Sequence, residues 1–258
     1  MSDHQKYDPL STFRLNGKRA LVTGAGRGIG LAIAQALAAV GAHVTLAARS
    51  KADIEKAALD ITASGYKADF VVLDITDVKK TAKYIESHAP FDVLINNAGT
   101  NRPGPFLDMS IDDYDTVFDL NSRAVFFASQ AVARRLIAAK KPGSIVNISS
   151  QMGHVGSVNR TIYCASKHAV EGLTKAMGVE LAPHNIRVNT VCPTFIETPL
   201  TKPFFEDKDF KAFVLGKIKL GRIGQVKDVV GGVLYLASDA SSMVTGSALK
   251  IDGGWTAD

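Results

Sequence analysis

Short apolar runs alternate with longer amphipathic segments along the chain from Lys18 onward. The apolar runs predict strands at residues 20–23, 44–47, 70–73, 93–95, 144–148, 187–191 and 248–251. The segments between them repeat apolar residues at helical spacing and predict helices at residues 29–40, 51–64, 78–88, 111–139, 163–181 and 226–238. Several of the strands are apolar throughout, as expected when helices cover both faces of a parallel sheet.

This strand–helix–strand rhythm predicts an α/β fold: a doubly wound, Rossmann-like parallel sheet of about seven strands with helices on both faces. No linker or repeat interrupts it, so we expect residues 1–258 to form a single domain. Residues 1–14 are polar and predict a loose tail. Residues 193–220 are rich in Pro, Phe and charge and follow the sixth strand, where we expect either a mobile substrate lid or a surface excursion without function.

Composition excludes several classes of function. The formal net charge of +5 is modest, and basic residues are mixed with acidic ones, so we expect no nucleic-acid binding. No uncharged apolar run is long enough to span a bilayer, and we expect no membrane association. Two distant cysteines and no signal-peptide pattern predict a cytoplasmic protein. The six histidines are dispersed without zinc-ligand spacing, so no metal site is expected.

A glycine-rich turn follows the first predicted strand and leads directly into a helix. It fits T-G-x-x-x-G-x-G and not G-x-G-x-x-G, and it comprises Thr23, Gly24, Ala25, Gly26, Arg27, Gly28, Ile29 and Gly30. A diphosphate at a helix N-terminus gains from free backbone N–H groups and the helix dipole, and glycines let the backbone approach it. The position of the turn therefore predicts a dinucleotide site.

The end of the second strand indicates which dinucleotide binds. An Asp or Glu there holds the ribose 2′-hydroxyl of NAD, whereas this strand ends at Ala48 and Arg49. A carboxylate would repel a 2′-phosphate, and the planar guanidinium of Arg49 can bond it, with Arg27 closing from the glycine-rich turn. We therefore expect NADP(H) rather than NAD(H). The alternative is that both arginines are solvated surface charges.

Tyr163 and Lys167 are four residues apart on a predicted helix and therefore lie on one face. A free phenol has a pKa of about 10, and a nearby ammonium lowers that pKa toward the working range of an acid–base catalyst. The spacing is common by chance. Ser150, at the carboxyl end of a predicted strand, strengthens the interpretation because it could hydrogen-bond a substrate oxygen.

Together these residues resemble the short-chain dehydrogenase/reductase family over Lys18 to Trp255. The resemblance rests on the glycine-rich turn, the Asn96-Asn97-Ala98-Gly99 motif, and then Asn121, Ser150, Tyr163 and Lys167 in the family's order. It implies a single dehydrogenase domain in which Tyr163 is the general acid–base. Lys167 would lower the pKa of Tyr163 and bond the nicotinamide ribose, and Ser150, preferred over Ser149, would orient the carbonyl. Asn121 would kink its helix and hold a water that relays protons to Lys167.

The resemblance also implies the remaining cofactor contacts. Asp74 and Ile75 match positions that contact adenine. The adenosine side would be lined by Asn97, Ala98 and Gly99. The positions near the nicotinamide carboxamide are matched by Pro193, Ile196 and Thr198. This chain departs from the family's Pro-Gly at Thr194, where a side chain intrudes near the nicotinamide. Relatives are usually tetramers that pack the last strand and the helix at residues 226–238 across a twofold axis. Gly231 and Gly232 would permit that approach, or an intrachain contact.

Three functions remain open. The first is an NADP(H)-dependent oxidoreductase that interconverts a secondary alcohol and a ketone on a small polar substrate such as a sugar, polyol or sugar acid. Its substrate contacts would come from Arg102, residues 151–160, Thr194 and the lid, with Phe195, Phe204 and Phe205 as apolar alternatives. The second is a reductase of 3-oxoacyl thioesters on a carrier protein or coenzyme. The third is a non-catalytic nucleotide-binding sensor, which would have no need of the Asn121, Ser150, Tyr163 and Lys167 set.

Overall fold

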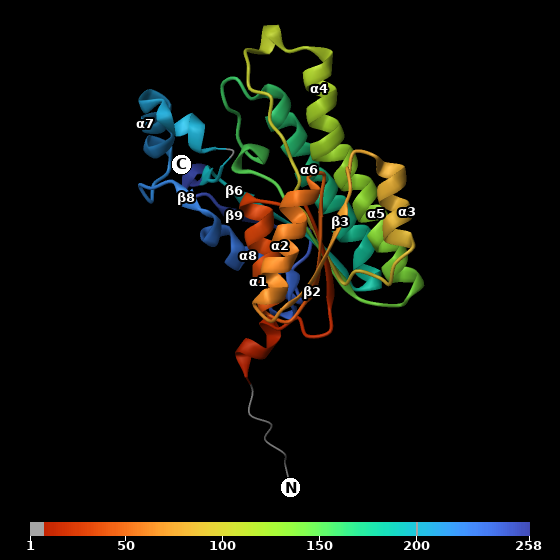
Figure 1. Ribbon diagram of the computed structural model, residues 1–258. Coiled ribbons are helices and arrows are strands. Elements are labelled where there is room, and N and C mark those ends of the chain that lie inside the picture. The colour runs from red at the N-terminus through yellow and green to blue at the C-terminus, as the bar shows by residue number, and fades with distance from the viewer. Residues whose placement is uncertain (1–7, 200) are drawn as a thin grey trace.

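Seven parallel strands form the central sheet of the computed structural model, which describes residues 8–199 and 201–258 (Figure 1). In spatial order they are β3 (Lys67–Val72), β2 (His43–Ala48), β1 (Arg19–Thr23), β4 (Val93–Asn96), β5 (Gly143–Ile148), β6 (Ile186–Pro193) and β9 (Ala248–Ile251). β1 pairs with β2 on one side and β4 on the other, so the strand order reverses there. The predicted doubly wound sheet is confirmed, and its switch point lies at the ends of β1 and β4.

Helices cover both faces of the sheet. One face carries α1 (Gly28–Ala39), α2 (Lys51–Ala63) and α8 (Val226–Ala237), which share one apolar core with the strands. The other carries α3 (Val78–Glu86), α4 (Ile111–Phe118), α5 (Ala124–Ala138) and α6 (Thr161–Leu181) (Figure 1). β4 is buried along its whole length, whereas the edge strand β3 is only partly buried. Helices on both faces thus account for the uniformly apolar inner strands.

The helix predicted over residues 111–139 is interrupted. α4 and α5 are joined by a π-helical turn at Asp119–Arg123, which contains Asn121. Such turns insert a residue into the helical ladder and are frequent at functional sites. Apolar periodicity continues on both sides of the turn, and for this reason the sequence pattern predicts one helix.

The segment at residues 193–220 contains more regular structure than its sequence suggests. β7 (Ile196–Glu197) pairs with β8 (Gly224–Gln225), and α7 (Lys208–Lys217) begins at Asp207, whose carboxylate accepts from two backbone N–H groups. α7 lies beside the C-terminus in Figure 1, and its Val214 packs with Trp255. The turn residues before α7 obscure a helix that the Asp207 cap could have indicated.

The expected tail at residues 1–14 is described from residue 8 onward, and residues 1–7 lie outside the described part of the chain. Pro9–Phe13 form a short 3₁₀ helix, and Leu15 is buried with its N–H bonded to Val40 O. Across the described residues, no helix has both the length and the apolar character needed to cross a membrane.

Candidate active site

The glycine-rich turn and the Asn97 loop are joined at the switch point. The Asn97 side chain donates to Thr23 O (2.9 Å) and Gly24 O (3.2 Å), and Thr23 Oγ1 accepts from the N–H groups of Asn97 and Ala98. Gly24 has a φ of +65°, and a Cβ there would lie 2.9 Å from Ala98 Cα. A Cβ on Gly30 would collide with the Asn97 amide and Gly24 O. Close approach of two backbone segments therefore requires both glycines.

The start of α1 fits a phosphate group. Arg27 occupies the cap position, and within the described residues its side chain makes no capping hydrogen bond. The first N–H groups of the helix are therefore free to bind an anion, assisted by the helix dipole. Thr198 faces the same turn, because a Cβ on Gly28 would lie 3.7 Å from the Thr198 side chain. These residues fit the diphosphate of a dinucleotide.

The end of β2 faces the same turn. Ala48 Cβ lies 3.9 Å from the position of a Cβ on Gly26, and Arg49 is exposed beside it. Burial raises the pKa of Asp74, but hydrogen bonds from Thr76 and the charge of Arg49 outweigh it and leave that pKa lowered. Asp53, which follows the strand in sequence, also approaches Gly26. Ala48 and Asp53 are therefore the side chains from the end of β2 onward that approach the turn at Gly26.

Ile75 differs from its neighbour Asp74. Its side chain is buried and packs with Leu73 and Ala124, so it belongs to the core and offers the cofactor no exposed side chain.

Ser150, Tyr163 and Lys167 meet in a cavity of about 220 Å³ at the carboxyl ends of β4, β5 and β6. Ser150 Oγ donates to Gln151 Oε1 (2.8 Å) and accepts from Met152 N (3.1 Å), and Ser150 lies close enough to the Tyr163 hydroxyl to lower its pKa. The neighbouring Ser149 lies instead beside Cys192. The structure therefore brings Ser150, and not Ser149, to the phenol.

The pKa of Tyr163 is raised, opposite to the direction that the sequence predicts, and burial is the main cause, partly offset by Ser150. Lys167 Nζ donates to Ile148 O (2.9 Å) and lies 5.6 Å from the centre of the Tyr163 ring. Burial also lowers the pKa of Lys167 to about 8, against the opposing influence of Cys192 and Glu171. Desolvation is thus the largest influence on the pKa of each group in the chain alone.

Asn121 holds the loop that follows β4. It is fully buried, its Oδ1 accepts from Thr100 N (2.9 Å), and its Nδ2 donates to Thr100 O (2.9 Å) and Ser166 Oγ (3.1 Å). A Cβ on Gly99 would lie 3.3 Å from Asn121 Oδ1 and 3.7 Å from Lys167 Nζ, so Gly99 separates the two side chains. The π-helical turn therefore positions Asn121 between the loop and α6.

The remaining cofactor candidates lie around the same cavity. Pro193, Ile196 and Thr198 line it, together with Ile29 and Asn97.

Several substrate candidates separate into two groups. Arg160, Gln151, Thr194, Phe195 and Phe204 also line the cavity. Arg102 is exposed outside it, and Phe205 packs in the apolar cluster around Trp255. Thr201, in the expected lid, also lines it, whereas sequence reasoning missed Thr100 and Asn101. The position of Asn101, two residues after the Asn97 motif, was the available signal.

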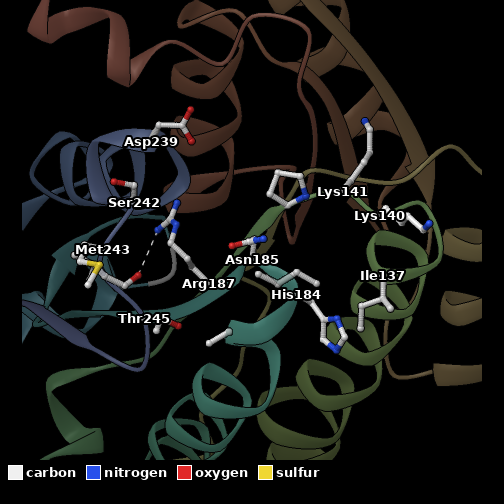
Figure 2. Close-up of a pocket in the computed structure, with 14 residues that line it drawn as sticks. Ile137, Lys140, Lys141, His184, Asn185, Arg187, Asp239, Ser242, Met243 and Thr245 are labelled. Atoms are coloured by element: carbon white, nitrogen blue, oxygen red, sulfur yellow. Dashed lines mark hydrogen bonds between the residues drawn. The ribbon is translucent and has the colours of Figure 1, made fainter.

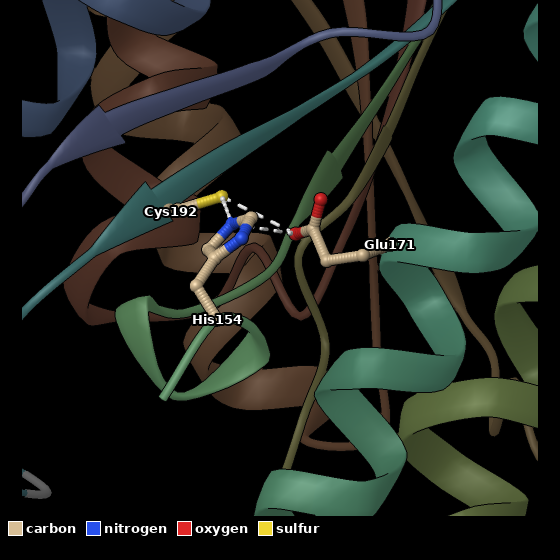
Figure 3. Close-up of side chains that lie close together, drawn as sticks. All are labelled: His154, Glu171 and Cys192. Atoms are coloured by element: carbon tan, nitrogen blue, oxygen red, sulfur yellow. Dashed lines mark hydrogen bonds and ion pairs between the residues drawn. The ribbon is translucent and has the colours of Figure 1, made fainter. Parts of the chain in front are cut away.

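His154, Glu171 and Cys192 come together behind the cavity (Figure 3), although their sequence spacing indicates no metal site. Cys192 donates to Glu171 Oε1 (3.3 Å), His154 Nε2 lies 3.6 Å from the same oxygen, and Thr190 donates to Glu171 Oε2 (2.9 Å). Burial, reinforced by Glu171, raises the pKa of Cys192 to about 12. A metal requires a thiolate, whereas a protonated thiol suits this arrangement as a hydrogen-bonded network.

A larger hollow of about 820 Å³ lies at the opposite ends of β5 and β6 (Figure 2). Arg187 lies in its wall and donates to Leu236 O (3.0 Å), Ser238 O (2.9 Å) and Ser241 Oγ (2.6 Å). These bonds tie the start of β6 to the end of α8. The hollow is remote from the glycine-rich turn, and its arginine is already engaged in holding the fold together.

Comparisons with known proteins agree with this geometry. A family model described as enoyl-(acyl carrier protein) reductase matches residues 24–256. L-xylulose reductase from Bos taurus is 44% identical over 244 residues, covering 95% of this chain and 98% of its own. The 3-oxoacyl-[acyl-carrier-protein] reductase FabG of Thermotoga maritima is 41% identical, covering 93% and 98%. A structure of gluconate 5-dehydrogenase from Burkholderia cenocepacia with NADP and tartrate superposes with a TM-score of 0.93 at 35% identity, covering 97% and 100%.

Proposed function

The chain belongs to the short-chain dehydrogenase/reductase family, and on that premise we propose that it is an NADP(H)-dependent oxidoreductase. It interconverts a secondary alcohol and a ketone on a small polar substrate, which is a sugar, a polyol or a sugar acid. The observation that carries the proposal is that Ser150, Tyr163 and Lys167 line one cavity, which also touches the glycine-rich turn at Ile29. L-xylulose and gluconate in the names of relatives support a polyhydroxylated substrate.

The proposed roles follow from the geometry. Tyr163 exchanges a proton with the substrate oxygen, and Ser150 orients that oxygen by hydrogen bonding. Lys167 bonds the nicotinamide ribose, and Asn121 holds the Thr100 loop against α6. When bound, the dinucleotide supplies or accepts the hydride. Arg27, Arg49 and the start of α1 would hold its phosphates.

A substrate panel tests this function. Purified enzyme is assayed for oxidation of sugars, polyols and sugar acids with NADP⁺, and for reduction of acetoacetyl thioesters with NADPH. The change in NADPH absorbance measures turnover in both directions. We expect turnover of polyhydroxylated compounds. Turnover of thioesters alone would favour the 3-oxoacyl reductase that Thermotoga FabG exemplifies. Binding of NADPH without turnover of any compound would favour a sensor.

The pH profile should report the state of Lys167. Because burial lowers the pKa of this ammonium to about 8, the group is charged below that pH and neutral above it. The kcat/KM for ketone reduction is therefore expected to be level below pH 8 and to fall about tenfold per unit above it. Stopped-time assays from pH 6 to 10 would measure the profile. A level profile up to pH 10 would contradict the assigned role of Lys167.

We also infer a cytoplasmic tetramer. Leu107 and Ile111, before and at the start of α4, are 90% and 82% exposed, which is unusual for large apolar side chains. On α8, a Cβ at Gly231 would meet no atom of the described residues within 4 Å, whereas Gly232 packs against Ile251 of its own chain. Gly231 thus leaves one face of α8 open to a second copy.

A further inference from the structure

Four buried polar atoms without a hydrogen-bond partner belong to residues that line the cavity containing Tyr163. They are Asn101 Oδ1, Ser149 Oγ, Gln151 Nε2 and Thr194 Oγ1, and none has a partner within residues 8–199 and 201–258. Buried polar groups are nearly always paired, because an unpaired one costs about 1–3 kcal/mol. Four such atoms, from the three segments that follow β4, β5 and β6, point to a ligand that pairs some of them.

The orientation of Gln151 places one of these atoms beside the reaction centre. Its Oε1 accepts the hydroxyl of Ser150 (2.8 Å), and the side chain is 2% exposed. Since Ser150 fixes one end of the amide, the other end, Nε2, is left as a donor in the cavity wall.

Thr194 directly follows β6 and lines the cavity. Its backbone N–H bonds Ile251 O (3.2 Å), which fixes the residue, while its hydroxyl remains unpaired among the described residues. The hydroxyl can donate and accept, as the hydroxyls of a polyol do. Thr194 thus offers a polar contact to a hydroxylated ligand.

Arg160 adds a positive charge to the same wall. The side chain is partly buried, and burial lowers the pKa of its guanidinium. Among the described residues its one hydrogen bond is from Nη1 to Asn159 O (3.0 Å), next to it in sequence. A guanidinium presents five donors in a planar fork that matches a carboxylate. Most of that fork is free at the cavity.

We propose that the substrate is a sugar acid whose carboxylate binds Arg160 and whose hydroxyls pair Gln151, Thr194 and Asn101. This inference rests on the proposed function and narrows its substrate class. A 3-oxoacyl chain offers no hydroxyls to the unpaired atoms, and a neutral polyol leaves the Arg160 fork unused. A sugar acid satisfies both features.

Matched pairs of aldonates and alditols test the carboxylate contact. Five- and six-carbon pairs, such as D-gluconate and D-sorbitol, differ at one end of the molecule only. With NADP⁺, we expect the best aldonate to exceed its alditol in kcat/KM by at least about tenfold. Arg160→Gln should lower kcat/KM for the aldonate about 10- to 100-fold, the range for hydrogen bonds to charged groups, and leave the alditol nearly unchanged. Arg160→Lys should restore part of the loss.

Two controls separate recognition from damage to the fold. Arg134→Gln removes the same charge from an exposed position on α5 and should change neither rate. Calorimetric titration of D-gluconate into NADPH-loaded wild type and Arg160→Gln should show binding that weakens in the variant. A preference for the alditol, or equal losses on both substrates in Arg160→Gln, would overturn the proposal.

Thr194 provides an independent test of the hydroxyl contacts. Thr194→Val keeps the shape and removes the hydroxyl, and kcat/KM for the aldonate should fall about three- to tenfold. Thr194→Ser, which keeps the hydroxyl, should retain most of the rate. Equal rates in Val and Ser variants would remove Thr194 from the proposal. If neither member of any pair is oxidised while a thioester is reduced, the proposed function itself fails, a result distinct from loss of the carboxylate preference.

Discussion

Tyr163→Phe is expected to lower kcat by about 10²- to 10⁴-fold, the contribution of a positioned general acid–base. The substitution removes only the hydroxyl near Ser150 and leaves the ring against Lys167. Residues at the glycine-rich turn are untouched, so NADPH affinity should change by less than about threefold. Steady-state assays and NADPH fluorescence titration would measure the two quantities separately.

The matched control for this prediction is Tyr66→Phe, since Tyr66 is 43% exposed and remote in sequence from the cavity-lining residues. It should retain full activity. A Tyr163→Phe enzyme that keeps more than about a tenth of wild-type kcat, with an unchanged melting temperature, would show that another group transfers the proton. Ser150 would then be the first alternative, because its hydroxyl lies in the same hydrogen-bond chain.

Local patterns predicted the strands and the doubly wound parallel sheet well, because the inner strands are buried on both faces and are therefore apolar throughout. They also predicted that Tyr163 and Lys167 lie on one helical face, because α6 is a regular helix from Thr161 to Leu181. The glycine-rich turn could also be predicted from the sequence, because its glycines follow a recognisable pattern. The structure requires glycine at positions 24 and 30, where a Cβ would collide with neighbouring atoms.

Contacts that depend on burial could not be read in this way. Apolar periodicity continues on both sides of Asn121, so the π-helical turn leaves no mark on it. The convergence of Asn101, Gln151 and Thr194 joins three loops far apart in sequence, and spacing carries no information about it. Desolvation of Tyr163 and Lys167 likewise reverses the direction expected for the phenol pKa, because a sequence shows which charges are near but not how much water they lose.

The second large effect is expected at the end of β2. Ala48→Asp places a carboxylate beside the turn at Gly26, where it would repel a 2′-phosphate and accept the 2′-hydroxyl of NAD. The ratio of kcat/KM for NADPH to that for NADH should fall about 100-fold or more, through loss with NADPH and gain with NADH. Arg49 remains in place, so the change reports the added charge alone. Initial rates with both cofactors at saturating substrate would give the ratio.

Ala48→Asn is the matched control, because asparagine has the size of aspartate without its charge. It should shift the ratio by less than about tenfold, since an amide neither repels phosphate nor binds the ribose as a charged acceptor. Equal shifts in the two variants would mean that side-chain size, and not charge, sets cofactor choice at this position. A wild-type enzyme that already prefers NADH would refute the role of Arg49, and the nearby Asp53, which approaches the same turn, would then be the carboxylate to test.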